Sequence, residues 1–148
     1  MFTFFLSISS LFEIELNIST GVQRFSRSDI EMSTWINVFQ SFLDFCKKRK
    51  IPVVVAAGNK PGVEYAHDSY PQALSQPDDT MIIVGGVTQT GALYTTTVQD
   101  PDGCIAVYAP AENIAVPKPG GAIPGVVEQA GTSHAAAIVV RKQSYKFP

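Results

Sequence analysis

The fold class is decided by the stretch 51–59, which reads Ile51-Pro52-Val53-Val54-Val55-Ala56-Ala57-Gly58-Asn59. No polar side chain occurs from Ile51 to Ala57, and a glycine and an asparagine follow. An uninterrupted apolar run is typical of a parallel strand that is covered on both faces. The stretch therefore predicts a buried strand over 51–57 in an α/β fold, with Asn59 just beyond its carboxyl end.

A helix is predicted immediately before this strand, over residues 29–50. Ser28 and Glu31 have the spacing of a capping box, and apolar residues then recur every three or four positions. The basic run 47–50 lies where cations complement the helix dipole. This position predicts a solvated last turn rather than a localisation or phosphate-binding patch. Pro52 prevents the helix from continuing.

The ends of the predicted strands indicate where a ligand would bind. A strand over 11–18 joins the helix 29–50 and the strand 51–57 into a crossover unit, which is expected to be right-handed. In open α/β sheets, ligands bind beyond the carboxyl ends of the strands. Ser19-Thr20-Gly21 and Gly58-Asn59 lie at two such ends.

A tight turn before an apolar helix is predicted by the segment Gly131-Thr132-Ser133-His134-Ala135-Ala136-Ala137. Gly131 supplies backbone freedom and permits the close approach of another group. Ser133 lies where a helix begins, so nearby N–H groups are unpaired and the helix dipole favours negative charge. A nucleophilic serine needs this environment, because acyl transfer builds an oxyanion. The alternative is that Ser133 only caps the helix.

Five short motifs, in the same order as in the family, resemble the subtilases, the subtilisin-like serine proteases. They are Asn17-Ile18-Ser19-Thr20-Gly21, Val53-Val54-Val55-Ala56-Ala57-Gly58-Asn59, Tyr70-Pro71 with Thr80–Val87, Ile105–Pro110, and Gly131-Thr132-Ser133 with Ala135. The resemblance extends from about residue 16 to residue 140. It implies part of the subtilisin-like three-layer α/β fold, with a mostly parallel sheet.

The resemblance also divides the chain and assigns roles to residues. It implies an uncertain N-terminal segment over 1–15, a partial catalytic domain over 16–140 and a truncated or non-native tail over 141–148. The implied function is that of a serine-type endopeptidase fragment acting on a peptide or protein. Its nucleophile would be Ser133 and its oxyanion donor Asn59, and the residues expected to line the substrate cleft are Ser19, Thr20, Gly21, Ala56, Ala57 and Gly58. The alternative for Asn59 is a residue that tolerates a left-handed turn after a strand.

The catalytic base and its orienting carboxylate are missing from the predicted triad. The two histidines, His67 and His134, do not lie in the family's His-Gly-Thr setting, and the chain contains no Asp-[Ser/Thr]-Gly segment. His134 follows Ser133 directly, and adjacent helical residues do not face each other. We therefore predict a partly exposed rim position for His134 and a surface loop for His67.

Two hypotheses follow for the incomplete site. In the first, sequence upstream of Met1 encodes the missing aspartate and histidine, and the complete domain is a protease. In the second, the chain is a catalytically dead remnant or a peptide-binding pseudoprotease.

Composition restricts the class of protein further. A hydrophobic content of 45% excludes gross disorder, and a net charge of −2 gives no reason to expect nucleic-acid binding. The apolar run 1–11 is too short to span a membrane and has no convincing signal-peptide pattern. Localisation is therefore unassigned, although the family is commonly secreted.

The remaining sequence features predict no cofactor. Cys46 and Cys104, the latter in a predicted strand, are expected to be free thiols rather than a disulfide. No metal-ligand spacing is visible, so no metal ligand and no cofactor is assigned, although resemblance to the family allows calcium. The proline-containing stretch 111–127 predicts a surface loop.

Overall fold

The computed structural model describes residues 4–10, 13–19, 21–23, 28–62, 65–76, 81–118 and 125–143. Its main sheet has the strand order β1-β2-β4-β6-β7. Strand β1 is antiparallel to β2, whereas β2, β4, β6 and β7 run parallel. These strands are β1 (Phe4–Ser10), β2 (Glu13–Ile18), β4 (Val53–Ala56), β6 (Met81–Val87) and β7 (Val107–Pro110).

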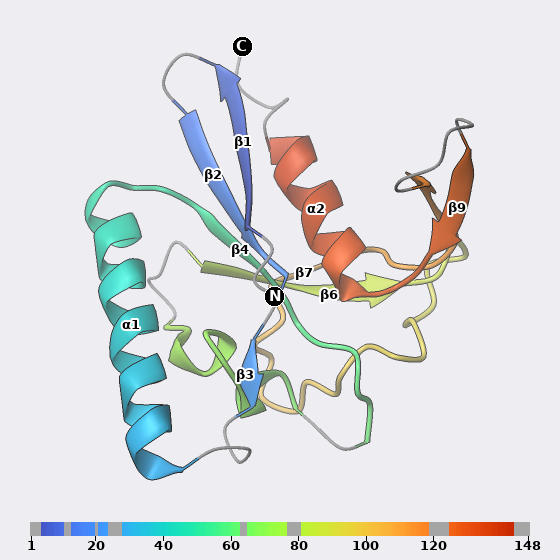
Figure 1. Cartoon of the computed structure of the whole chain (residues 1–148). Coiled ribbons are helices and arrows are strands. Elements are labelled where there is room, and N and C mark those ends of the chain that lie inside the picture. Colours follow the sequence, from blue (N-terminus) through green and yellow to red (C-terminus); the bar gives the residue numbers. More distant parts are fainter. Residues whose placement is uncertain are drawn as a thin grey trace.

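Two long helices complete the layers. Helix α1 (Asp29–Lys48) lies on one side of the sheet and helix α2 (Thr132–Gln143) on the other (Figure 1). The chain is therefore a three-layer α/β structure with a mostly parallel sheet, which confirms the predicted fold class.

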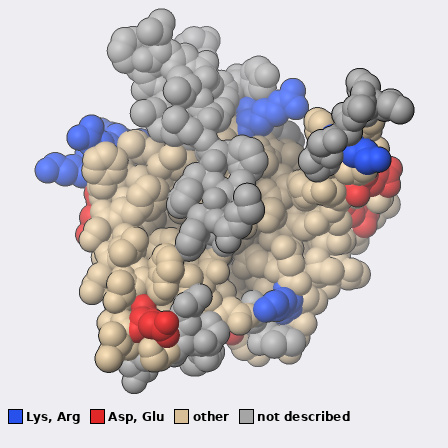
Figure 2. All heavy atoms as spheres, viewed as in Figure 1, with Lys and Arg blue, Asp and Glu red and all other residues tan. Residues whose placement is uncertain are grey.

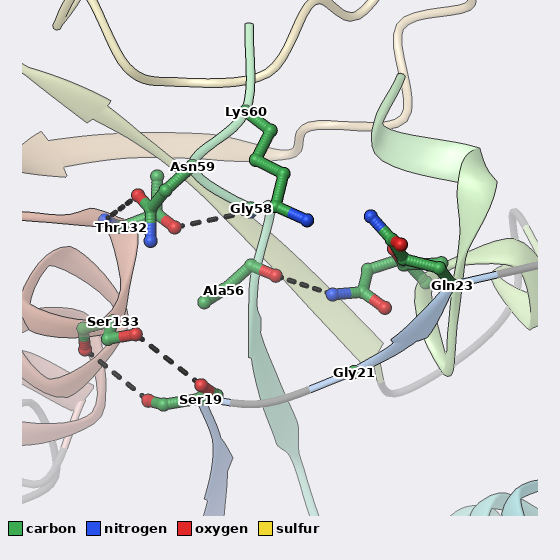
Figure 3. A pocket seen from close by; sticks show the side chains of 11 residues that line it. Ser19, Gly21, Gln23, Ala56, Gly58, Asn59, Lys60, Thr132 and Ser133 are labelled. Atoms are coloured by element: carbon green, nitrogen blue, oxygen red, sulfur yellow. Dashed lines mark hydrogen bonds between the residues drawn. The ribbon is translucent and has the colours of Figure 1, made fainter. Parts of the chain in front are cut away.

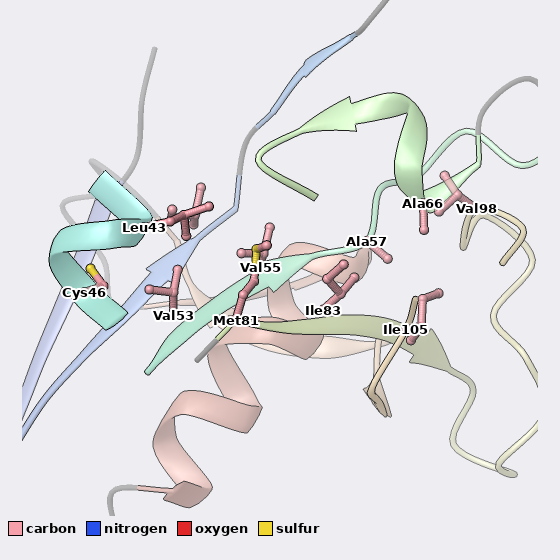
Figure 4. Packing of buried hydrophobic residues seen from close by; sticks show 11 residues of the cluster. Leu43, Cys46, Val53, Val55, Ala57, Ala66, Met81, Ile83, Val98 and Ile105 are labelled. Atoms are coloured by element: carbon pink, nitrogen blue, oxygen red, sulfur yellow. The ribbon is translucent and has the colours of Figure 1, made fainter. Parts of the chain in front are cut away.

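Strand β4 lies at the centre of the molecule, and its side chains alternate between the two faces of the sheet. Val53 and Val55 belong to the cluster that contains Leu43 of α1 (Figure 4). Val54 belongs to the opposite cluster, together with Ala136 of α2. All of these β4 valines are fully buried. A strand that packs against helices on both faces needs apolar side chains at every position, which explains the uninterrupted run.

Helix α1 begins as predicted but ends earlier. The capping box is present: the Ser28 side chain accepts from the Glu31 N–H, and the Glu31 carboxylate accepts from the Ser28 N–H. At the other end, the Ile51 N–H donates to the Cys46 carbonyl, and Lys50 has a left-handed φ of 56°. This bonding pattern is a Schellman motif, which satisfies the last carbonyls and ends the helix at Lys48 instead of residue 50.

The prediction of a surface loop over 111–127 was wrong. Strand β8 (Ile114–Pro117) lies in this stretch and pairs antiparallel with β9 (Val126–Gln129), which begins inside it. The prolines had suggested irregular structure, but Pro117 lies at the end of a strand, where its missing N–H is tolerated.

The prediction that Cys104 lies in a strand was also wrong. Strand β7 begins only at Val107, because the N–H groups of Cys104 and Ile105 donate to the Asp100 carboxylate at 2.7 and 2.8 Å. These bonds hold the segment as a loop. Cys46 and Cys104 are both free.

Regular secondary structure extends into both end segments of the predicted division, 1–15 and 141–148. The N-terminal segment contributes β1, which pairs with β2 in a register that places Phe4 opposite Ile18. The cations at 141 and 142 do not interrupt α2, which continues to Gln143 because Arg141 is exposed to solvent. Residues 144–148 of the predicted tail lie outside the described residues. No helix within the described ranges is long and apolar enough to cross a membrane.

Gly86 in β6 provides a test of the core packing. A Cβ atom at this position would lie 2.5 Å from the Ala111 Cβ and 2.8 Å from the Thr97 Oγ1. Gly86→Val is therefore expected to lower the free energy of unfolding by about 1–3 kcal/mol through overpacking. Urea denaturation measures the change, and Ala115→Val on the exposed side of β8 is the control, expected to change stability little.

Candidate active site

Two hydrogen bonds join the turn after β4 to the start of α2. The Thr132 N–H donates to the Asn59 Oδ1 at 2.8 Å, and the Gly58 N–H donates to the Thr132 Oγ1 at 3.2 Å (Figure 3). The partners are 73 and 74 positions apart in the sequence. Because a backbone N–H requires an acceptor, the Asn59 amide must present its oxygen to Thr132 and its nitrogen to the other side.

Gly131 allows this contact to form. Its φ is +136°, and a Cβ atom there would lie 3.3 Å from the Asn59 Nδ2. Its N–H donates to the Ala111 carbonyl at 2.7 Å, which fixes the turn before α2. A side chain at position 131 would therefore be strained by the backbone and crowded by Asn59. The close approach predicted for Gly131 is present.

Ser133 lies in the first turn of α2 and faces the end of β2. Its Oγ donates to the Ser19 carbonyl and the Ser19 Oγ donates to the Ser133 carbonyl, both at 3.4 Å (Figure 3). The N–H groups of the neighbouring Thr132 and His134 donate to Asn59 and Gly131. Among the described residues, no acceptor takes the N–H of Ser133 itself. The helix start thus offers a donor beside the serine hydroxyl.

A pocket of about 250 Å³ brings most of the predicted site residues together. The predicted residues that line it are Ser19, Gly21, Ala56, Gly58, Asn59 and Ser133. Ala57 does not line this pocket, because it is 2% exposed and packs in the core. Thr20 lies outside the described residues.

The pocket also contains residues that the sequence reasoning missed. Strand β3 (Val22–Gln23) pairs antiparallel with β5 (Ser69–Tyr70), and this pairing places Gln23 and Ser69 at the pocket. Lys60, which follows Asn59 in the sequence, also lines the pocket. A short helix, η2 (Gln72–Leu74), follows β5. Its Gln72 is buried and donates through Nε2 to the Ala56 carbonyl at 2.7 Å. No local spacing in the sequence indicates these contacts, because they depend on how the segments meet.

Neither histidine lines the pocket. His67 lies in the short helix η1 (Ala66–Asp68) rather than in an irregular loop. Its Nδ1 is 2.8 Å from the Asp102 carboxylate, at ion-pair distance but without hydrogen-bond geometry, and its ring stacks on Tyr65. His134 is half-buried. The described part of the chain therefore places no imidazole in the pocket of Ser133.

The two thiols are weak competitors for nucleophilic chemistry. Burial raises the pKa of the Cys46 thiol. Burial, followed by the charges of Asp100 and Asp102, raises the pKa of the Cys104 thiol. A raised pKa lowers the thiolate fraction at neutral pH, and the thiolate is the reactive form. Ser133 is therefore the candidate nucleophile.

Charged side chains do not mark a second site on the face shown in Figure 2. Lysine and arginine side chains form small separate groups there, and uncharged residues cover most of the described surface. Within the described ranges, no group of three or more His, Cys, Asp or Glu side chains could hold a metal ion.

Thr132 is expected to hold the site together through its buried hydroxyl. Thr132→Val preserves the shape of the side chain but leaves the Gly58 N–H without its acceptor. An unsatisfied group of this kind costs about 1–3 kcal/mol of stability, which chemical denaturation would measure. Thr132→Ser keeps the hydroxyl and is the control. A loss in Thr132→Val that is no larger than the loss in Thr132→Ser would contradict the assignment of the effect to the hydrogen bond.

The fold is shared with solved protease structures. No family model and no curated protein matches the chain. It is similar to a lanthipeptide protease, with 21% identity and a TM-score of 0.69 over 86% of this chain and 44% of that one. It is also similar to the MycP3 protease of the type VII (ESX-3) secretion system, with 23% identity and a TM-score of 0.59 over 86% and 40%.

A third structure with this fold is the PatG macrocyclase domain, with 19% identity and a TM-score of 0.63 over 86% of this chain and 34% of that one. The chain spans less than half the length of all three structures. At these identities the likeness establishes the fold. The chain has part of a subtilisin-like protease fold, as its motifs predicted.

Proposed function

We propose that this chain carries the nucleophile, the oxyanion donors and part of the substrate cleft of a serine endopeptidase. Ser133 is the nucleophile, and the Asn59 Nδ2 and the Ser133 N–H are the oxyanion donors. The observation that carries the proposal is the 2.8 Å bond from the Thr132 N–H to the Asn59 Oδ1. This bond orients the Asn59 amide beside the start of α2, at a pocket that Ser133 also lines.

The reaction that fits this arrangement is acyl transfer. The Ser133 Oγ attacks the peptide carbonyl carbon, the hydroxyl proton passes to a base, and the oxyanion accepts hydrogen bonds from the two donors. Collapse of this intermediate breaks the C–N bond, and the protonated amine leaves. Water then attacks the acyl-serine, which releases the carboxylic acid and restores the hydroxyl. Neither histidine lines the pocket, so in this proposal a group other than His67 and His134 supplies the base.

A peptide-binding protein without chemistry is the second candidate. The Ser133 Oγ bonds to the Ser19 carbonyl, and a carbonyl cannot take its proton. In this case the pocket would hold a peptide, and Ser133 would serve as a structural residue.

A serine-directed fluorophosphonate with imidazole in the buffer separates the two candidates. Free imidazole can supply the missing general base, so labelling of Ser133 is expected to rise with imidazole concentration. Mass spectrometry locates the label, and Ser133→Ala is expected to remove it. Peptide binding with no labelling of Ser133 at any imidazole concentration would favour the binding protein.

A further inference from the structure

The side of the pocket away from Ser133 has an unusual set of polar groups. Figure 3 shows Gln23 across the pocket from Ser133. Gln72, Ser69, which pairs with Gln23, and Lys60 line the same pocket. Among the described residues that line the pocket there is no carboxylate, and Ala56 has the largest purely apolar side chain. The only formal charge in this lining is therefore positive.

The polar groups of the pocket lie where the side chain of a bound peptide would enter. Ser133 and Asn59 line the same pocket, so a carbonyl carbon that Ser133 attacks lies at one side of it. The side chain next to that carbonyl then enters the remaining space. A volume of about 250 Å³ is below the ~300–1,000 Å³ of pockets that enclose drug-sized ligands. The pocket thus suits one peptide side chain.

Lys60 determines which charge a peptide side chain in this pocket can carry. It is exposed and follows Asn59 directly, and Figure 3 shows its amine pointing toward the Gln23 side of the pocket. An ammonium has three N–H donors, so it can bind a ligand carboxylate and a second acceptor together. A cationic ligand side chain would be repelled. An aliphatic one would make no hydrogen bond to the polar lining.

We infer that this pocket selects a peptide with a side-chain carboxylate, glutamate or aspartate, at the residue that precedes the scissile bond. Lys60 is the specificity-determining residue, and Gln23 and Ser69 supply donors for the same carboxylate. The inference rests on the proposed function, because Ser133 defines which peptide residue enters the pocket.

Binding of four peptides to the full chain tests this inference without needing catalysis. The peptides are acetylated, end in a carboxamide, and differ only in a last residue that is Glu, Gln, Leu or Lys. Isothermal titration calorimetry is expected to give the tightest Kd for Glu, a value on the order of tenfold weaker for Gln, and the weakest for Lys. Raising the salt concentration is expected to reduce the ratio between Glu and Gln.

Variants of Lys60 identify the source of the preference. Lys60→Met keeps the length of the side chain and is expected to bring the Glu and Gln peptides within about twofold. Lys60→Glu is expected to reverse the order, so that the Lys peptide binds more tightly than the Glu peptide. Lys118→Met removes an exposed lysine that does not line the pocket and is expected to leave the preference unchanged.

Two results would overturn the inference, and NMR separates them from failure of the proposed function. Equal affinity for the Glu and Gln peptides, or a preference that survives Lys60→Met, overturns the specificity while the cleft still binds peptides. Peptides that leave the amide signals of Ser133 and Asn59 unshifted overturn the proposed function and the inference together.

Discussion

The purified 148-residue chain is expected to leave casein and peptide amides uncleaved. Ser133 has the proposed oxyanion donors beside it but no imidazole in its pocket, because His67 lies beside Asp102 and His134 does not line the pocket. Serine proteases without a functional triad retain only ~1,000- to 10,000-fold acceleration over water, whereas enzymes typically reach ~10⁶-fold or more. The residual rate is too low to register in an ordinary assay.

The assay is release of a fluorophore from a peptide amide, with Ser133→Ala as the control. Both proteins are expected to give the same background signal. A turnover signal that disappears in Ser133→Ala would contradict the expectation, because it would mean that the chain activates its serine without an imidazole.

The second large effect concerns Asn59. A peptide boronate forms a tetrahedral, negatively charged adduct with a serine and thereby imitates the oxyanion intermediate. Asn59→Asp keeps an acceptor for the Thr132 N–H but replaces the Nδ2 donor with an anionic oxygen. The variant is therefore expected to bind a peptide boronate ~100- to 1,000-fold more weakly, the typical cost of losing an oxyanion donor.

A matched peptide carboxamide shows whether the loss of affinity comes from the lost contact with the oxyanion. It has no negative charge to stabilise, so its affinity for Asn59→Asp is expected to change little. Fluorescence competition measures both ligands. An equal loss for the boronate and the carboxamide would mean that Asn59 shapes the pocket rather than stabilising the oxyanion.

Local patterns in the sequence were sufficient to predict the central layers of the fold. The buried strand within 51–57 and the capping box at Ser28 were predicted correctly, because buried strands and helix starts depend on neighbouring residues. Strands β8 and β9 were missed, because their pairing depends on contacts between segments. Proline identity alone could not distinguish a strand end from a loop.

The site was predictable to a similar extent. Asn59 and Ser133 could be named as candidates because each belongs to a recognisable segment, and the structure brings them to one pocket. The hydroxyl of Thr132 and the amide of Gln72 could not be identified, since their partners Gly58 and Ala56 are distant in the sequence. Such contacts arise only when the sheet and α2 are assembled.

The most direct test of the account is a crystal structure of the chain with a peptide boronate. We expect a bond between boron and the Ser133 Oγ, with one boronate oxygen about 2.7–3.1 Å from both the Asn59 Nδ2 and the Ser133 N. The peptide side chain next to boron should occupy the pocket beside Lys60. A boronate that is bound without a bond to Ser133, or an oxygen that faces away from Asn59, would contradict the claim that these two residues form a nucleophile and its oxyanion site.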